Sequence, residues 1–190
     1  MRILIISGSA RANSVTRRVA TYLQNYLEEK THYDIDLIDL RKNNLPPVES
    51  VYTSLESTPD RYKSLAENIF NANAFILVSP EYNGSYSPAM KNLLDHFPKH
   101  NHKAFGIVTA SPGAMGGMRA AMQLQQLIFG LFGIGSPHML IIPAVDKKFD
   151  ADGKLVDESF EKNIHNFVTE FIWLAEKLTG EKRGNLKKAV

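Results

Sequence analysis

Short, continuous runs of hydrophobic residues alternate along the chain with segments of helical periodicity. Such runs, without regular polar positions between the apolar ones, are typical of strands buried on both faces of a parallel sheet. The pattern predicts five strands, over residues 2–7, 33–40, 74–79, 104–110 and 137–142. Strands of this kind need a crossover between them, which is usually a helix.

Between and after these runs, apolar residues recur at spacings of three and four, which predicts amphipathic helices. The clearest stripe comes last, where Phe160, Ile164, Phe167 and Phe171 fall on one side. Helices are predicted from about residue 14, over 59–71, after residue 87, over 117–132 and over 159–178. The alternation predicts a single α/β domain over residues 1–178, with a doubly wound parallel sheet covered by helices on both faces.

The composition is that of an ordinary globular domain, with 44% hydrophobic and 22% charged residues. The chain has no cysteine, which excludes a disulfide framework, a thiol nucleophile and a thiolate metal site. No secretory or membrane-spanning segment is visible, so we expect a soluble, cytoplasmic protein without a membrane partner. The formal charge of +2 is concentrated in the tail 179–190. We interpret that tail as a solvated, flexible terminus, and we expect no nucleic-acid partner because no basic face accompanies it.

Two stretches suggest metal binding and fail on inspection. His96, His100 and His102 lie close together, but no carboxylate partner is evident, and a solvated loop is the prediction. The segment 148–159 resembles a calcium loop, yet Lys148 and Ser159 stand where the loop needs acids. We therefore predict a turn there, and no metal site in the chain.

The loop after the first strand combines hydroxyl and amide side chains with Arg11, directly before a helix. It lacks both the Lys-Ser/Thr pair of the P-loop and the G-x-G-x-x-G dinucleotide fingerprint. Free N–H groups and the dipole at a helix start attract a dianion, so the loop suits a terminal phosphate. A helix capped by Ser14 with nothing bound explains the same residues.

The loops after the third and fourth strands contain turn residues. Gly84 supports a positive φ angle, and Ser87 with Pro88 predicts the next helix start. Gly113, Gly116 and Gly117 allow the backbone to approach a flat ligand, although an ordinary glycine-rich turn has the same composition. Because the carboxyl ends of parallel strands share one edge, all three loops are predicted to meet there.

Three motifs carry a resemblance to a known family: Gly8-Ser9-Ala10-Arg11 with Ser14, Pro80-Glu81-Tyr82-Asn83-Gly84-Ser85, and Ser111-Pro112-Gly113 with Gly116-Gly117. In this order and spacing they resemble the NADPH-dependent FMN reductases, flavodoxin-like proteins that include quinone, azo-dye and chromate reductases. The resemblance covers roughly residues 2–178. It implies a three-layer sandwich whose parallel sheet has the strand order 2-1-3-4-5.

The resemblance also implies bound FMN, with NADPH or NADH as co-substrate and a small-molecule electron acceptor such as a flavin, a quinone or an azo compound. The phosphate would lie on Ser9, Arg11, Asn13, Ser14 and Thr16. The ring would lie against Pro80, Glu81, Tyr82, Asn83, Gly84, Ser111, Gly113, Gly116 and Gly117. No catalytic side chain is expected, because hydride transfer is the chemistry of the flavin. Glu81 either ties its loop down or is solvated.

The predicted helix 117–132 is apolar around most of its circumference, which indicates burial on most sides. A small domain has limited room for that, so we predict a homodimer or homotetramer that uses this helix. The resemblance implies the same, since members of the family are commonly dimers or tetramers. The alternative function is an FMN-binding electron carrier or redox-sensing module with a protein partner. Arg11 and the nearly neutral charge favour the reductase.

Overall fold

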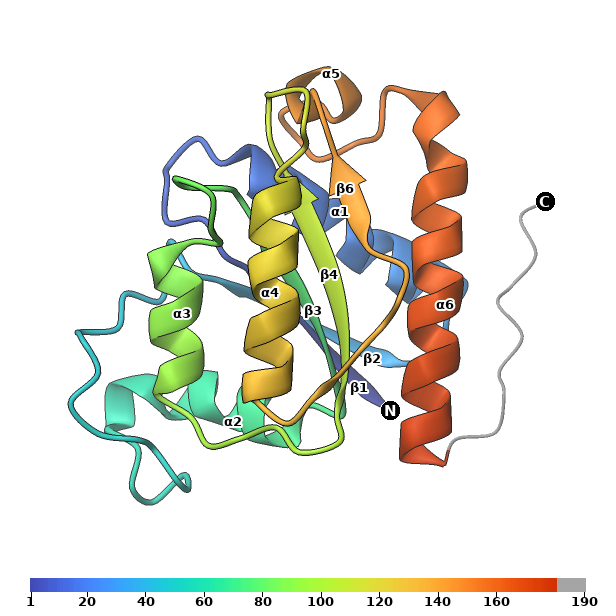
Figure 1. Cartoon of the computed structure of the whole chain (residues 1–190). Coiled ribbons are helices and arrows are strands. Elements are labelled where there is room, and N and C mark those ends of the chain that lie inside the picture. Colours follow the sequence, from blue (N-terminus) through green and yellow to red (C-terminus); the bar gives the residue numbers. More distant parts are fainter. Residues whose placement is uncertain (181–190) are drawn as a thin grey trace.

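The computed structural model describes residues 1–180 as one parallel sheet between two layers of helices (Figure 1). The sheet has the order β2-β1-β3-β4-β5, and a further short strand, β6, also pairs with β4. The strands are β1 Arg2–Ser7, β2 Asp34–Asp39, β3 Ala74–Ser79, β4 Ala104–Ala110, β5 Ile134–Gly135 and β6 Leu140–Ile142. All of these pairings are parallel. The predicted strand order is confirmed.

Each central strand is apolar along its length because it supplies two cores. In β1, Ile3 and Ile5 point to one face, where α1 and α6 pack, whereas Leu4 and Ile6 point to the other, where α2, α3 and α4 pack. All four side chains are fully buried. The polar ends of the strands are therefore left as the places where binding groups can gather.

The helices begin close to the predicted positions. Their bounds are α1 Val15–Lys30, α2 Lys63–Asn71, α3 Pro88–Asp95, α4 Met118–Gly130, α5 Val145–Lys148 and α6 Glu161–Thr179. The predicted caps are confirmed: Ser14 Oγ accepts the N–H of Arg17 at 3.1 Å, and Ser87 Oγ accepts the N–H of Met90 at 3.1 Å. The sequence did not predict the short helix α5. Of the predicted tail 179–190, Thr179 ends α6, and residues 181–190 lie outside the described part of the chain.

The fifth predicted strand is wrong in detail. Instead of one strand over 137–142, two short pieces line β4: β5 beside Ala104 and Phe105, and β6 beside the stretch from Val108 to Ala110. The Ser136 N–H still donates to the Phe105 carbonyl at 2.7 Å. Regular pairing with β4 then stops next to Pro137 and resumes at Leu140.

The histidines predicted to lie in a solvated loop are largely buried, so that prediction is wrong for two of them. His96 is 1% exposed, with its Nδ1 2.7 Å from the Asn92 carbonyl oxygen. His100 is 5% exposed, and its ring lies 4.7 Å from that of Phe75. The connection from α3 to β4 packs into the core here, and the His100 N–H donates to the Leu131 carbonyl at 2.9 Å.

Within residues 1–180, no group of three or more histidine, aspartate or glutamate side chains is arranged to hold a metal ion. The calcium-like segment is a turn, as predicted, in which Asp150 Oδ1 accepts the N–H groups of Asp152 and Lys154 at 3.0 and 2.8 Å. Over the same residues, no helix has both the length and the apolar character that a bilayer crossing requires.

Acidification is expected to destabilise the fold through His100. Burial, assisted by the charge of Lys103, lowers the pKa of His100 from 6.5 to about 4. Between these values the unfolded chain binds more protons than the folded one, so the free energy of unfolding falls as the pH falls through this window. The loss is on the order of 3 kcal/mol. In His100→Phe that share of the pH dependence should disappear from urea unfolding measured at pH 7 and pH 4.5.

The matched control is His102→Gln, because His102 is an exposed neighbour. This variant should keep the full pH dependence of the wild type. Equal pH dependence in His100→Phe and the wild type would show that His100 is protonated in the folded state without cost.

Candidate functional site

The loops that follow β1, β3 and β4 meet at the carboxyl edge of the sheet and enclose a cavity of about 180 Å³. Its lining comes from all three loops: Ser9, Arg11, Asn13, Ser14, Val15, Thr16, Pro80, Glu81, Tyr82, Ala110, Ser111 and Pro112. The structure therefore brings together the residues predicted to bind the phosphate, on the first loop, and the first residues of the other two loops. Asn83, Gly84, Gly113, Gly116 and Gly117 lie in the same loops without lining this cavity.

The base of the first loop is fixed by the neighbouring elements. The Gly8 N–H donates to the Val78 carbonyl at 2.8 Å, and the Ser87 hydroxyl donates to the Gly8 carbonyl. A Cβ atom on Gly8 would lie 2.6 Å from the side chain of Met90 and 3.1 Å from the Val78 carbonyl oxygen. The loop thus starts from a position that only glycine can occupy without displacing its neighbours.

Salt bridges from the second strand brace the same loop. Asp39, at the end of β2, is 8% exposed and pairs with Arg17 at 3.2 Å and with Arg41 at 3.3 Å. Arg41 also donates to the Ala12 carbonyl at 3.2 Å. Arg17 and Arg41 are thus engaged by Asp39, whereas Arg11 lines the cavity.

Arg11 makes a contact that the sequence did not predict. Its guanidinium lies over the ring of Tyr82, 4.6 Å from the centroid, so the first loop touches the second across the cavity. Arg11 is exposed and Tyr82 is half-buried. Beneath them, Ser9 and Thr16 are buried, and Ser9 Oγ lies 3.4 Å from the N–H of Arg11, which donates to it. Hydroxyl, amide and guanidinium donors thus stand at the start of a 16-residue helix, which is a donor set suited to a dianion.

The second loop is a tight hairpin turn. The Tyr82 N–H donates to the Ser85 carbonyl at 2.8 Å, and the Ser85 N–H donates back to the Tyr82 carbonyl at 3.1 Å. The two residues between them, Asn83 and Gly84, have φ angles of 52° and 82°. Positive φ at both central positions defines a type I′ turn, for which Asn-Gly is the preferred pair. The polar stretch after β3 is consequently rigid.

The third loop needs glycine at its second half. Gly116 and Gly117 have φ angles of 61° and 88°, and a Cβ on Gly116 would lie 2.7 Å from the Pro143 backbone nitrogen. Gly113 differs, because a Cβ there would meet nothing closer than the Ser111 hydroxyl, at 3.4 Å. The fold therefore requires Gly116 and Gly117, whereas the space beside Gly113 is open.

The structure resolves the role of Glu81. Its Oε2 accepts the N–H groups of Arg119 and Ala120 at 3.1 and 3.3 Å, which ties the second loop to the first turn of α4. The sequence shows one hint of this contact: Gly117, the residue before α4, has no side chain with which to cap the helix. Nothing in the sequence identifies which distant residue supplies the cap.

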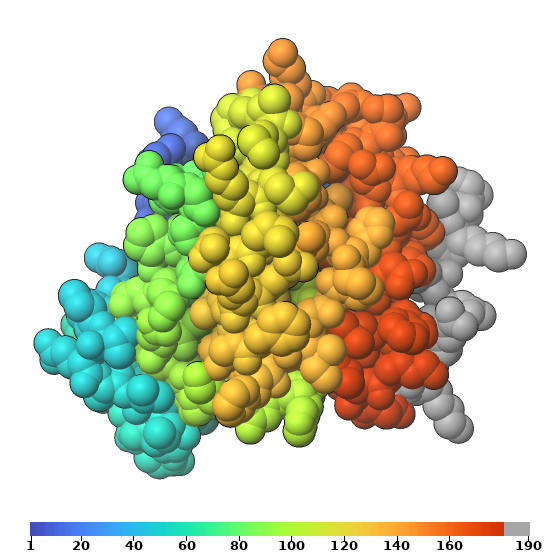
Figure 2. Space-filling model, viewed as in Figure 1, coloured from blue at the N-terminus to red at the C-terminus, as the bar shows by residue number. Residues whose placement is uncertain are grey.

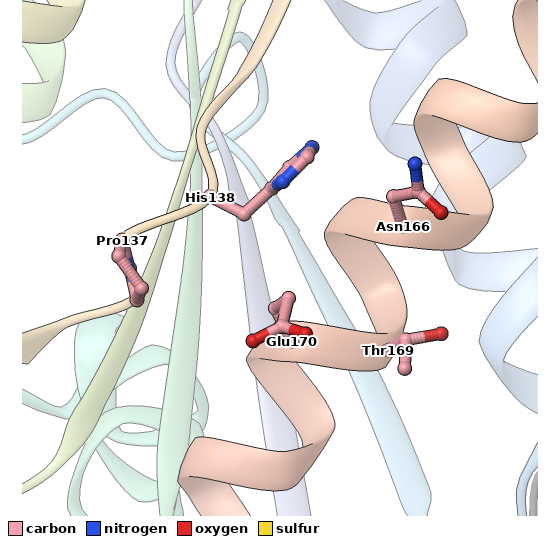
Figure 3. Close-up of a pocket in the computed structure, with 5 residues that line it drawn as sticks. All are labelled: Pro137, His138, Asn166, Thr169 and Glu170. Atoms are coloured by element: carbon pink, nitrogen blue, oxygen red, sulfur yellow. The ribbon is translucent and has the colours of Figure 1, made fainter.

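Three larger cavities lie elsewhere in the described part of the chain. One, of about 420 Å³, is lined by Pro137, His138, Asn166, Thr169 and Glu170 and separates the β5–β6 connection from α6 (Figure 3). In that view His138 extends from the connection toward α6. Another, of about 370 Å³, lies beside α1 and shares Asn13 and Ser14 with the candidate site, and a third, of about 400 Å³, is lined by residues of α1, of β2 and of the loop after β2. None of the three joins the loops that follow β1, β3 and β4, so the smaller cavity is the better candidate despite its volume.

Strand order and site position together define a flavodoxin-like α/β protein with a ligand site at the carboxyl ends of its parallel strands. A mutant flavodoxin from Pseudomonas aeruginosa superimposes with a TM-score of 0.53 at 18% identity, covering 90% of this chain and 99% of that one. Residues 1–146 match the family model described as NADPH-dependent FMN reductase. The chain belongs to that family.

Individual relatives agree with this assignment. An FMN-dependent NADPH-azoreductase from Staphylococcus saprophyticus is 30% identical over 178 residues, which are 90% of this chain and 94% of the relative. Its Staphylococcus aureus counterpart is 31% identical over 179 residues, with the same coverage. The NAD(P)H:(acceptor) oxidoreductase FerB from Paracoccus denitrificans has a TM-score of 0.74 at 25% identity, covering 93% of this chain and 97% of its own. The predicted family, fold and reductase function are confirmed.

Proposed function

We propose that the chain binds FMN across the three loops and uses it to transfer electrons from NADPH or NADH to a small-molecule acceptor of the azo, quinone or flavin class. The observation that carries the proposal is the shared cavity. Its hydroxyl, amide and guanidinium donors on the first loop face the tight turn of the second loop and the glycine-containing third loop. The naming of relatives as FMN-dependent NADPH-azoreductases supports the cofactor, the co-substrate and an azo acceptor.

The residues of the first loop fit the terminal phosphate of FMN. Ser9 and Thr16 offer hydroxyl donors, Asn13 an amide and Arg11 a guanidinium, all ahead of α1. Ser14 Oγ accepts a capping hydrogen bond, which leaves its hydroxyl hydrogen free to donate. A dianion here is stabilised both by these donors and by the dipole of a long helix.

The cavity volume of about 180 Å³ is below the roughly 300–1,000 Å³ of typical small-molecule sites. We therefore assign the cavity to the phosphate and sugar-alcohol chain, and we place the ring along its open side. The wall there has two parts. One is the Tyr82–Ser85 turn, with Asn83 and Gly84, and the other is the loop from Ser111 to Gly117, with Gly113 and Gly116. When bound, FMN would supply the chemistry of hydride acceptance and of electron transfer to the acceptor. The residues of these two loops would hold its ring.

A spectrum of the freshly purified protein, before and after addition of FMN, tests the cofactor. We expect flavin absorbance that remains with the protein through gel filtration and that is bleached under anaerobic conditions by about one equivalent of NADPH per flavin, because a hydride carries two electrons. A parallel titration with NADH measures the preference between the two nicotinamides. A colourless protein that takes up no FMN would refute the proposal.

Arg11→Ala should weaken FMN binding by about 1.5–3 kcal/mol, roughly ten- to 150-fold in Kd, because a charge-assisted hydrogen bond is lost. Quenching of flavin fluorescence measures the Kd. Arg61→Ala is the matched control, since Arg61 also stacks on a tyrosine, 4.7 Å from the Tyr62 ring centroid, but lies outside the site. Equal affinity of Arg11→Ala and the control would remove Arg11 from the phosphate site.

The chain is further proposed to form a homodimer or homotetramer through α4, and to act in the cytoplasm, which suits a chain without cysteine. One side of α4 remains uncovered: Met118, Met122 and Phe129, spaced by four and seven residues, are 39%, 51% and 72% exposed. Phe132, just beyond the end of α4, is 61% exposed. Figure 2 looks onto α4, drawn in yellow between α3 and the β5–β6 connection. Large apolar side chains exposed on one side of a helix can take part in an interface.

Light scattering at micromolar concentration should give two or four times the chain mass of 21.3 kDa. Phe129→Glu should shift the mass toward that of one chain, because a charge replaces the most exposed apolar side chain of α4. Val156→Glu, at another exposed apolar position, should leave the mass unchanged. A wild-type mass equal to one chain would contradict the prediction.

A further inference from the structure

The start of α4 is capped by a residue from a distant part of the chain. The helix follows Gly117, whose left-handed backbone has no side chain to offer the first-turn N–H groups. Glu81 supplies the acceptor instead, with Oε2 at 3.1 Å from the Arg119 nitrogen and 3.3 Å from the Ala120 nitrogen. The carboxylate thus does for α4 what Ser14 and Ser87 do for their own helices.

Glu81 also fixes the distance between the second and third loops, which border the proposed ring site. A Cβ on Gly117 would lie 2.9 Å from Cβ of Thr109 and 3.7 Å from Cβ of Glu81, so the third loop fits between β4 and the second loop without spare room. On the far side of Glu81, the Cβ position of Gly84 lies 3.7 Å from Cδ of Arg119. The hairpin turn and the start of α4 are therefore docked at two points.

The charge of this cap has little compensation from other side chains. The nearest guanidinium nitrogen of Arg119 is 4.0 Å away, and that side chain is 68% exposed, so the pair is weak. The Glu81 side chain is only 20% exposed. Its negative charge is balanced chiefly by the positive end of the α4 dipole, which would otherwise act on whatever lies between the two loops.

We propose that Glu81 is a positioning residue for bound FMN, an inference that rests on the proposed function. Its hydrogen bonds hold the second and third loops at the spacing that admits the ring. Its charge neutralises the helix terminus beside the ring and so disfavours added electron density on the flavin, which lowers the midpoint potential of the bound cofactor. The first effect depends on geometry and the second on charge, and substitution separates them.

The test compares Glu81→Gln, Glu81→Ala and the control Glu67→Gln, which removes the charge of an exposed carboxylate on α2. Without FMN, Glu81→Ala should lower Tm by about 2–6 °C, because the cap is lost, and Glu81→Gln should lower it less, because an amide oxygen still accepts. The Kd for FMN should rise about tenfold in Glu81→Ala and no more than about threefold in Glu81→Gln. The midpoint potential of the bound flavin should become more positive in both and should not move in Glu67→Gln.

The potential of Glu81→Gln decides the charge effect, since a purely structural role would leave it at the wild-type value. If both Glu81 variants bind FMN with wild-type affinity and potential, the inference is overturned while the proposed function stands. If Glu81→Ala does not fold, Glu81→Gln alone supports or overturns the inference through its potential. A wild-type protein that takes up no FMN would overturn both, and its Tm series would still report the cap.

Discussion

Burial of the parallel sheet on both faces governs where polar groups can stand in this protein. The side chains of β1, β3 and β4 are almost entirely committed to the two cores, so no strand interior can carry a binding group without breaking one of them. Parallel pairing then sends the exits of these strands to a single edge. The cavity formed by Ser9, Tyr82 and Ser111 is a direct result of that arrangement, because residues about 70 and 30 positions apart in the chain become neighbours.

Much of the fold could be predicted from the sequence because it depends on interactions between residues that are close together in the chain. The buried strands have continuous apolar runs, and Ser14 and Ser87 are recognisable caps because capping depends on residues only three positions away. The type I′ turn at Asn83-Gly84 is equally local, since backbone φ preference alone selects that pair. These features give the number of central strands, their order through the family resemblance, and the loops that form the site.

What the sequence missed depends on contacts between distant residues. The fifth strand is divided into β5, which pairs with the start of β4, and β6, which pairs with its end. His100 is buried because the connection that carries it crosses the core near Phe75 and Leu131. The stacking of Arg11 on Tyr82 and the capping of α4 by Glu81 likewise join loops that are separated by 71 and 38 positions. Periodicity and propensity contain no information about such pairs.

The interruption at Pro137 has a mechanical consequence for the last part of the sheet. The β5 segment is tied to the start of β4, whereas β6 is tied to its end, and the Ile142 carbonyl accepts the N–H of Ser111 at 3.1 Å. A continuous strand would transmit a one-residue insertion along its whole length and would reverse every side chain beyond it. Because no ladder connects β5 to β6, an insertion in the connection between them would leave the pairing of β6 unchanged. The position of Ser111, which is bonded to Ile142, would then be unchanged as well.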